Sequence, residues 1–242
     1  MGGGFIDAAH TALALLWNFD ARLGRVVALS LYVSGTACAI AALFGMALGA
    51  WLAVTRFPGR RIVVALLNTL LALPSVVVGL VVYLLLSRAG PLGALGILFT
   101  PTAMIIAQTL LVLPIVAALT RQLVADAWQG NGEQLRSMGA RALVAAALLL
   151  LHERLALVTV LLTAFGRAIS EVGAVMIVGG NIDGVTRVMT TTIALETSKG
   201  DLPLALGLGL VLLGVVGVLN ALIALVQRRR GAHDEARVAA TP

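Results

Sequence analysis

The chain is 242 residues long, with 60% hydrophobic and 12% charged residues, whereas soluble domains average about 25% charged residues. This composition excludes a soluble globular protein and indicates an integral membrane protein of one domain. The net charge of +6 does not indicate nucleic-acid binding, because the basic residues are sorted between the two sides of the predicted spans. The single cysteine, Cys38, allows no disulfide within the chain, and the three histidines lack metal-ligand spacing, so we expect no metal site.

Residues 1–25 are predicted to form an N-terminal interfacial segment. Its apolar stretch, residues 5–19, is too short to cross a bilayer and is interrupted by Asp7 and His10. We therefore expect a helix that lies on the membrane surface, with Trp17 at the level of the headgroups. The segment lacks the basic beginning that a cleavable signal peptide would have.

Five membrane-spanning helices are predicted within residues 26–227, and a charged tail follows. The spans are expected at about residues 28–54, 62–86, 100–120, 155–178 and 203–227. Pro74 is expected to kink the second span, Pro101 to begin the third and Pro114 to distort it. The tail, residues 228–242, is expected to be disordered.

Two shorter patterns refine these boundaries. Gly45-x-x-x-Gly49 in the first span predicts a close helix–helix contact. Residues 142–151 are apolar but too short to span, and polar residues 152–154 follow them. Joining this run to the next would place Arg154 at mid-membrane, at a cost of about 2.5–3.5 kcal/mol. We therefore interpret residues 142–151 as the interfacial end of the preceding loop.

Basic residues divide unevenly between the two sides that five spans create. One side carries eleven of them, namely Arg56, Arg60, Arg61, Arg121, Arg136, Arg141, Arg154, Arg228, Arg229, Arg230 and Arg237. The other side carries five, namely Arg22, Arg25, Arg88, Arg187 and Lys199. Because cytoplasmic loops are enriched in basic residues, we expect the N-terminus outside and the tail in the cytoplasm.

The longest polar stretch, residues 121–154, lies in a predicted cytoplasmic loop. Asn131 and Gly132 are expected to begin a short helix there, with Glu133 in the first turn, where a carboxylate suits the helix dipole. Gly139 is expected in the middle of that helix, where glycine permits another surface to approach closely. We interpret the segment as a docking surface, and an ordinary solvated loop is the alternative.

The spacing of Glu133 and Gly139 resembles the cytoplasmic loop of ABC importer permeases. In that pattern two alanines follow the glutamate, and two apolar residues and a proline follow the glycine. Here Gln134 and Leu135 replace the alanines, two leucines hold the apolar positions, and His152 replaces the proline. The resemblance implies three residues that couple the chain to an ATPase: Glu133, Arg136 and Gly139.

The predicted fourth span contains two ionisable residues, Arg167 and Glu171. Residues four apart share one helix face and can pair. Ionisable groups inside a span usually face a bundle interior or a water-filled path. One interpretation places the two residues, with Ser170, beside a translocation path, while the small Gly173 allows the close helix crossing of a gate. The alternative, which we favour, is an internal ion pair that fixes helix packing.

ATP hydrolysis is not expected from this chain. A phosphate-binding P-loop requires Gly-x4-Gly-Lys-Ser/Thr, and the single lysine, Lys199, lies in the sequence SKGD. If transport is driven by ATP, the nucleotide and its magnesium belong to a partner ATPase, and we expect no cofactor on this chain.

The most specific resemblance lies in residues 166–184, which read GRAISEVGAVMIVGGNIDG. This stretch is similar to the signature of tungstate ABC transporter permeases, which are relatives of the molybdate and sulfate permeases. Residues 73–93 and 100–109 extend the resemblance, which covers about residues 25–228. It implies an all-α polytopic protein with the MetI-like fold of type I ABC importers.

The resemblance also implies partners and a location. They are a second copy of the chain, two ATPase subunits and an extracytoplasmic tungstate-binding protein, at a bacterial inner membrane. The loop after the fourth span is expected to dock that binding protein through Asn181, Asp183, Thr186 and Arg187. An ordinary capping or turn role is the alternative for the threonines of this loop.

We therefore predict the membrane subunit of an ABC importer that moves tungstate inward. Molybdate or sulfate import is the alternative within this class. An ion-coupled carrier or a channel is the alternative from a different class, and it would need no ATPase.

Overall fold

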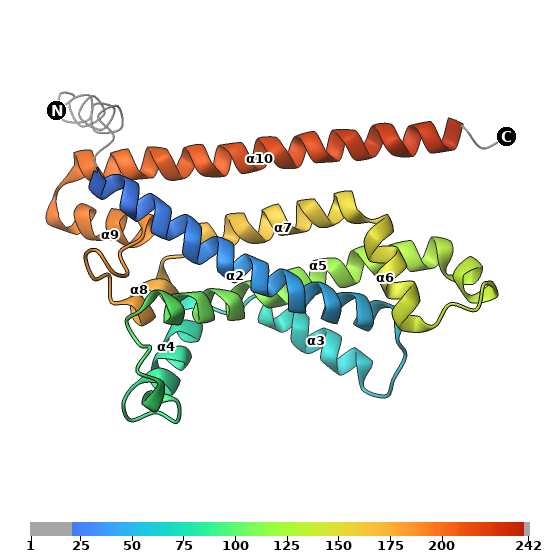
Figure 1. Ribbon diagram of the computed structural model, residues 1–242, viewed down its shortest axis with the longest axis horizontal. Helices are drawn as coiled ribbons and strands as arrows, with labels where there is room; N and C mark the ends of the chain where they lie inside the picture. The colour runs from blue at the N-terminus through green and yellow to red at the C-terminus, as the bar shows by residue number, and fades with distance from the viewer. Residues whose placement is uncertain (1–20, 240–242) are drawn as a thin grey trace. The chain divides into compact units, whose positions relative to one another are not determined.

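The computed structural model describes residues 21–239, among which no strand is assigned. This confirms the predicted all-α architecture (Figure 1). The helices in chain order are α2 (Ala21–Val54), α3 (Arg60–Leu70), α4 (Ser75–Leu86), the 3-10 turn η1 (Gly93–Leu95), α5 (Pro101–Ser137), α6 (Ala142–His152), α7 (Arg154–Ile169), α8 (Gly173–Gly179), α9 (Met189–Lys199) and α10 (Leu202–Ala239). The predicted N-terminal interfacial helix lies outside the described residues.

Three of the described helices are long and apolar enough to cross a membrane. Their apolar parts are Leu23–Val54, Pro101–Gly130 and Leu202–Arg228. Two pairs of shorter helices, α3 with α4 and α6 with α7, pass the same test only when each pair is taken as one broken span. The described residues therefore hold three to five spans, a range that includes the predicted five.

The second predicted span is two helices rather than one kinked helix. Helix α3 ends at Leu70, and α4 begins at Ser75, directly after Pro74. Proline donates no backbone hydrogen bond and disfavours helical geometry in the residue before it, so it ends a helix more readily than it bends one. Pro74 has extended backbone angles, with φ −63° and ψ 126°, and stands at the N-cap of α4.

The fourth predicted span is also interrupted. Helix α7 begins at Arg154, close to the expected boundary, and makes an angle of 79° with α6, which supports treating residues 142–151 as a separate segment. However, α7 ends at Ile169, and α8 begins only at Gly173. The expectation of one continuous helix to residue 178 is wrong.

Two helices extend beyond their predicted ends. Helix α5 begins at Pro101 as expected and continues to Ser137, so the expected short helix that starts at Asn131 is part of a longer one. Pro114 lies inside α5 without ending it. Helix α10 continues to Ala239, so most of the tail that we expected to be disordered is helical.

The chain forms two compact units. Among the described residues, the first contains 21–37, 74–110 and 167–217, and the second contains 38–73, 111–166 and 218–239. In the second unit, a Cβ on Gly45 would lie 3.0 Å from Val116, and one on Gly49 would lie 2.9 Å from the backbone nitrogen of Arg121. The Gly45-x-x-x-Gly49 motif therefore brings α2 against α5, as predicted.

The first unit depends on a close crossing of α4 and α8, which lie side by side in Figure 1. A Cβ on Gly79 of α4 would lie only 2.7 Å from the Cα of Ala174 in α8. The start of α9 is held to α2, because the Ser30 hydroxyl accepts a hydrogen bond of 2.8 Å from the Met189 N–H. These two contacts connect segments far apart in the sequence around residues 167–190.

Candidate functional site

The first candidate surface is the turn that joins α5 to α6. Gly139 has φ +75°, its N–H donates to the Arg136 carbonyl at 2.9 Å, and the Ala140 N–H donates to the Leu135 carbonyl at 3.0 Å. This pair of bonds is a Schellman motif, which satisfies the last carbonyls of a helix and requires a left-handed residue. Gly139 therefore ends α5, and our expectation of a mid-helix glycine is wrong.

The position of Glu133 also differs from the expected one. This residue lies near the C-terminus of α5 rather than in the first turn of a helix, so its carboxylate gains nothing from the helix dipole. Its side chain is exposed. The Arg136 guanidinium lies 5.1 Å from the Trp128 ring centroid, a cation–π distance. Met138 is 74% exposed and presents a large apolar side chain at the turn.

Helix α6 supports this turn from one side. Its Ala146 and Leu149 side chains are buried in a cluster with residues of α2 and α5, and Ala145 is buried as well. The opposite face is open, with Leu143 at 68% and Leu151 at 71% exposed. The result is a fixed, exposed and partly apolar surface within the second unit.

The second candidate site is the ion pair of Arg167 and Glu171. The two side chains are in direct contact, which confirms the predicted pairing. They are not on one continuous helix, however, because Arg167 lies in α7 and Glu171 lies in the break before α8. The Glu171 side chain is 3% exposed and that of Arg167 is 43% exposed. The Glu171 carboxylate is therefore the buried partner, whereas the Arg167 guanidinium remains partly accessible to solvent.

Glu171 also contacts three other segments of the first unit. Its carboxylate accepts a hydrogen bond from the Ala174 N–H at 3.2 Å and one from the side chain of Ser75. Its backbone carbonyl accepts a hydrogen bond of 2.7 Å from the Thr190 hydroxyl. A buried carboxylate is tolerated only when it is paired and hydrogen-bonded, and these donors meet that condition. We call Arg167, Glu171, Ser75 and Thr190 the carboxylate cluster.

Gly173, the first residue of α8, packs closely against the start of α4. A Cβ on Gly173 would lie 2.8 Å from the Val76 side chain and 3.0 Å from the Ser75 hydroxyl oxygen, so any larger residue there would require these side chains of α4 to move. Ser170 is exposed. The segment 170–173 therefore begins at the surface of the first unit, at Ser170, and ends in the close contact of Gly173 with α4.

Sequence reasoning missed Gln108, Ser75 and Thr190. The Gln108 amide donates a hydrogen bond of 3.0 Å to the Ala168 carbonyl at the end of α7, and its own carbonyl oxygen is buried without a protein partner. A signal existed for Gln108, because an amide within an apolar span usually has a specific partner. Serine and threonine are too common beside helix ends to be singled out from sequence alone.

The third candidate surface is the loop between α8 and α9. Gly180, Asn181 and Gly184 have left-handed backbones, with φ values of 68°, 50° and 72°. Thr186 is fully buried, its hydroxyl donates to the Gly179 carbonyl, and it accepts from the Ile182 N–H. The prediction that Thr186 lies on a docking surface is therefore wrong, because its hydroxyl holds the loop together from inside.

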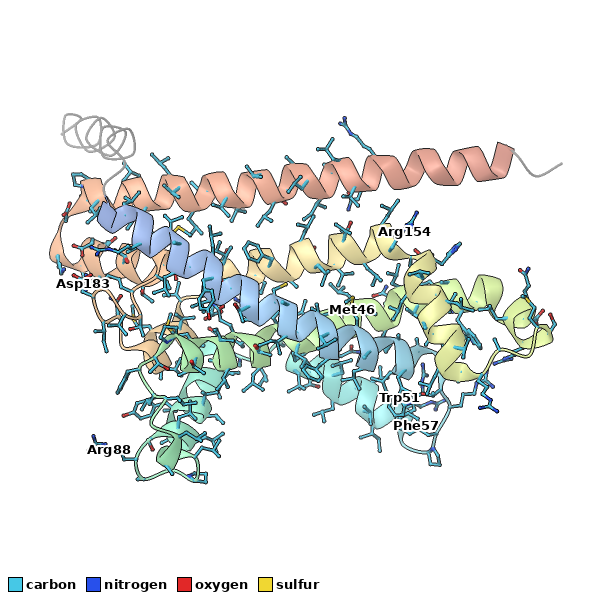
Figure 2. All side chains as sticks on the ribbon, in the orientation of Figure 1. Met46, Trp51, Phe57, Arg88, Arg154 and Asp183 are labelled. Carbon is cyan, nitrogen blue, oxygen red and sulfur yellow. The ribbon has the colours of Figure 1, made fainter. Side chains whose placement is uncertain are left out.

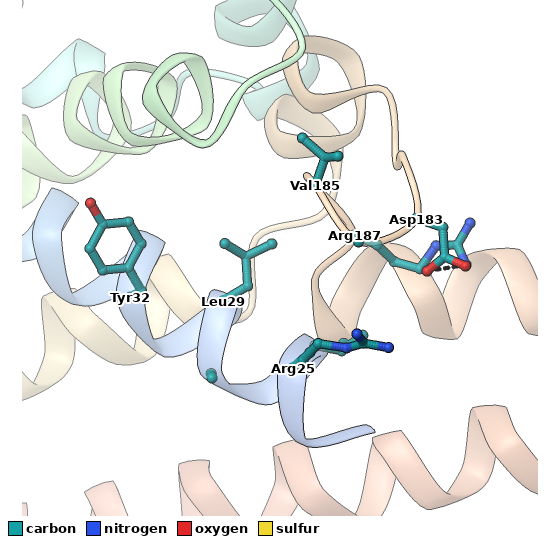
Figure 3. A pocket seen from close by; sticks show the side chains of 9 residues that line it. Arg25, Leu29, Tyr32, Asp183, Val185 and Arg187 are labelled. Atoms are coloured by element: carbon teal, nitrogen blue, oxygen red, sulfur yellow. Dashed lines mark ion pairs between the residues drawn. The ribbon is translucent and has the colours of Figure 1, made fainter. Parts of the chain in front are cut away.

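The other predicted loop residues are partly accessible. Arg187 pairs with Asp183 at 3.2 Å and donates to the Asn181 carbonyl at 3.4 Å. This pair borders a pocket of about 370 Å³ in the first unit (Figure 3). Arg25 and Tyr32, which lie on α2, line its other side, and both are exposed. The pocket offers a guanidinium, a phenol and an ion pair to a polar partner.

Similarity to known proteins identifies the family of this chain. No protein-family model matches the chain. The tungstate uptake system permease protein TupB of Peptoclostridium acidaminophilum is 46% identical over 221 residues, which are 91% of this chain and 97% of that protein. The chain belongs to the TupB family of ABC transporter permeases. This confirms the resemblance that residues 166–184 indicate.

Other members and relatives of the TupB family match over similar lengths. TupB of Campylobacter jejuni is 37% identical, over 88% of this chain and 90% of that protein. A probable anion ABC transporter permease protein of Haloferax volcanii is 42% identical, over 83% of this chain and 88% of that protein. Sulfate transport system permease proteins are more distant, at 27–28% identity.

Membership of the TupB family places the three candidate surfaces on a transporter permease, which is a membrane subunit. ABC transporter permeases work with ATPase and solute-binding subunits, so interaction surfaces are expected on such a chain. The two exposed surfaces, the α5–α6 turn and the α8–α9 loop, have the accessibility that such contacts need. In the carboxylate cluster Glu171 is buried, and its contacts belong to the packing of the first unit.

Proposed function

We propose that this chain forms the translocation path of an ABC importer that carries tungstate into the cell. The observation that supports this most strongly is the 46% identity to a tungstate uptake permease over 91% of this chain and 97% of that protein. A match over nearly the full length of both proteins covers the path, the loops and the coupling segment together. It therefore supports a shared role for the whole subunit.

The α5–α6 turn is proposed as the surface that receives movement from a cytoplasmic ATPase. Three properties support this role: Glu133 and Arg136 are exposed, Met138 is 74% exposed, and two backbone hydrogen bonds close the turn at Gly139. A turn closed by hydrogen bonds at the end of a long helix can pass a displacement on to that helix. Because the chain has no P-loop sequence, ATP and magnesium would bind to the partner.

The α8–α9 loop is proposed to meet an extracytoplasmic solute-binding protein. Its exposed Asp183 and the pocket beside Arg25 and Arg187 support this role, because charged loops select partners by complementary charge. The uneven division of basic residues supports an orientation with this loop and the N-terminus outside and the C-terminus in the cytoplasm.

A second copy of the chain is proposed to complete the path. Much of α4 is uncovered and apolar, with Val76 at 55%, Leu80 at 49% and Leu84 at 56% exposed. Lipid and a second subunit can both cover such a surface. Cysteine crosslinking through Leu84→Cys in membranes would trap a disulfide dimer if the two copies meet there.

The proposal is tested by transport measurements on a complete system. The chain would be reconstituted in liposomes with its ATPase and binding protein, and internal tungsten would be measured by mass spectrometry with and without ATP. We expect uptake that requires ATP and the binding protein, and weaker competition from sulfate than from molybdate, because all three anions carry the same charge but molybdate is closer to tungstate in size. Uptake that continues without the ATPase would favour an ion-coupled carrier instead.

A further inference from the structure

A basic turn between α2 and α3 has no role in the functions discussed above. It contains Arg56, Phe57, Pro58, Gly59, Arg60 and Arg61. A hollow of about 520 Å³ opens beside it, lined by Arg56, Phe57, Gly59, Arg60, Arg61 and Ile62. All of these residues belong to the second unit.

The turn is held in place by one of its own arginines. The Arg60 guanidinium donates to the Leu52 carbonyl at 2.8 Å and to the Ala53 carbonyl at 3.4 Å. These carbonyls belong to the last turn of α2 and lack helical partners, so the arginine acts as a C-terminal cap. Gly59 provides the left-handed residue of the turn, with φ +84°. The other two arginines thus extend from a fixed backbone.

Aromatic packing also holds the turn in place. The rings of Trp51 and Phe57 stack with centroids 5.1 Å apart and an interplanar angle of 23°, and Figure 2 labels both. Phe57 also packs against a buried cluster that includes Leu52 of α2 and Leu67 of α3. Tryptophan is enriched where a span meets the headgroup region. This position therefore suits the level of lipid phosphates.

The charge of the turn is unbalanced. Arg56 and Arg61 are exposed, and none of the ion pairs found among the described residues includes either of them. The sequence contains no aspartate or glutamate between Asp20 and Asp126. A hollow with two exposed guanidinium groups and no carboxylate lining it is complementary to an anion, and the guanidinium fork fits phosphate oxygens particularly well.

The adjacent surface indicates which anion fits. Helix α3 continues from the turn with Ile62 at 74%, Leu66 at 59% and Val63 at 38% exposed. A free phosphate ion would gain nothing from this apolar face, whereas the acyl chains of a lipid would cover it. We propose that Arg56 and Arg61 bind the phosphate headgroup of an anionic phospholipid whose acyl chains lie along α3.

The test compares two lipids on the purified full-length chain. Protein stripped of lipid in a neutral detergent would be titrated with phosphatidylglycerol or with phosphatidylcholine of the same acyl chains, and bound lipid would be counted by native mass spectrometry. We expect phosphatidylglycerol to bind more tightly. Because each basic residue contributes about fivefold to the affinity for an anionic surface, Arg56→Gln with Arg61→Gln should weaken binding by roughly 25-fold.

Two matched variants separate a site from general charge. Arg141→Gln with Arg154→Gln removes the same charge from two other exposed arginines and should bind phosphatidylglycerol like the unmodified chain. Arg56→Lys with Arg61→Lys keeps the charge but lacks the guanidinium fork, so it should bind phosphatidylglycerol more weakly than the unmodified chain and more tightly than the Arg56→Gln with Arg61→Gln variant. Equal losses in both glutamine pairs, or no preference for phosphatidylglycerol in the unmodified chain, would overturn the proposal. Displacement of the lipid by millimolar inorganic phosphate would also overturn it, in favour of a free-phosphate site.

Discussion

Gly79 of α4 lies so close to Ala174 of α8 that a Cβ on the glycine would be 2.7 Å from the alanine Cα. The two residues are 95 positions apart in the sequence. Their contact lies beside the carboxylate cluster, since Ser75 of α4 and the Ala174 N–H both donate hydrogen bonds to Glu171. Close packing and a buried charge therefore depend on the same helix crossing.

The first prediction concerns this crossing. Gly79→Ala places a methyl group against backbone atoms that cannot rotate away, and overpacking of this kind typically costs about 1–3 kcal/mol. Each kcal/mol lowers Tm by about 2–4 °C in a chain of this size. Thermal unfolding in detergent would measure the loss. Gly214→Ala in α10 is the control, because nothing lies within 4 Å of the added Cβ; equal Tm values for the two variants would contradict the close approach.

The second prediction concerns the buried charge. Glu171→Gln should reduce membrane yield, because it removes the charge that pairs with Arg167. Breaking a buried pair costs about 3–5 kcal/mol, and the cost here should be at the lower end because the Arg167 side chain is 43% exposed. The double variant Arg167→Met with Glu171→Leu should recover only part of the yield, since Ser75 and the Ala174 N–H lose their acceptor.

Uptake distinguishes the two roles discussed for this pair. If the pairing is structural, yield and uptake should fall and recover together across the single and double variants. A well-assembled Glu171→Gln variant that has lost uptake would instead indicate that the pair contacts the transported anion.

The third prediction concerns the α5–α6 turn. Gly139→Ala should uncouple transport from ATP hydrolysis more than Gly139→Asn, because asparagine tolerates a φ of +75° better than alanine does. The measurement is ATP-dependent uptake together with the ATPase rate of the assembled transporter. Gly130→Ala is the control, since Gly130 lies within α5 and a Cβ there meets nothing within 4 Å. Identical coupling in the alanine and asparagine variants would show that the left-handed turn is dispensable.

The fourth prediction concerns orientation. Cysteines at Val185, which is 46% exposed, and at Ala232 should react with an impermeant thiol reagent from opposite sides of intact cells. The background is Cys38→Ser, because the Cys38 thiol donates to the Leu161 carbonyl and a serine hydroxyl can do the same. Labelling of both positions from outside would contradict the proposed five spans.

Several properties of this protein follow from the sequence by itself. Long uncharged runs predict helices in a membrane, because only intrahelical hydrogen bonds can satisfy a backbone within lipid. Gly45-x-x-x-Gly49 predicts a close contact, and Arg167 with Glu171 predicts an ion pair; both are present. These inferences succeed because they depend on local spacing and on the cost of placing polar groups in an apolar environment.

The tertiary structure decided the features that depend on distant residues. Pro74 and residues 170–172 interrupt helices that composition alone predicts to be continuous, and the second break persists because Ser75, Arg167 and Ala174 satisfy Glu171 there. Thr186 is a polar loop residue in the sequence, yet its hydroxyl is buried between Gly179 and Ile182. The type of a residue limits which hydrogen bonds and ion pairs it can form. Which of them do form depends on the segments, often distant in the sequence, that the fold brings next to it.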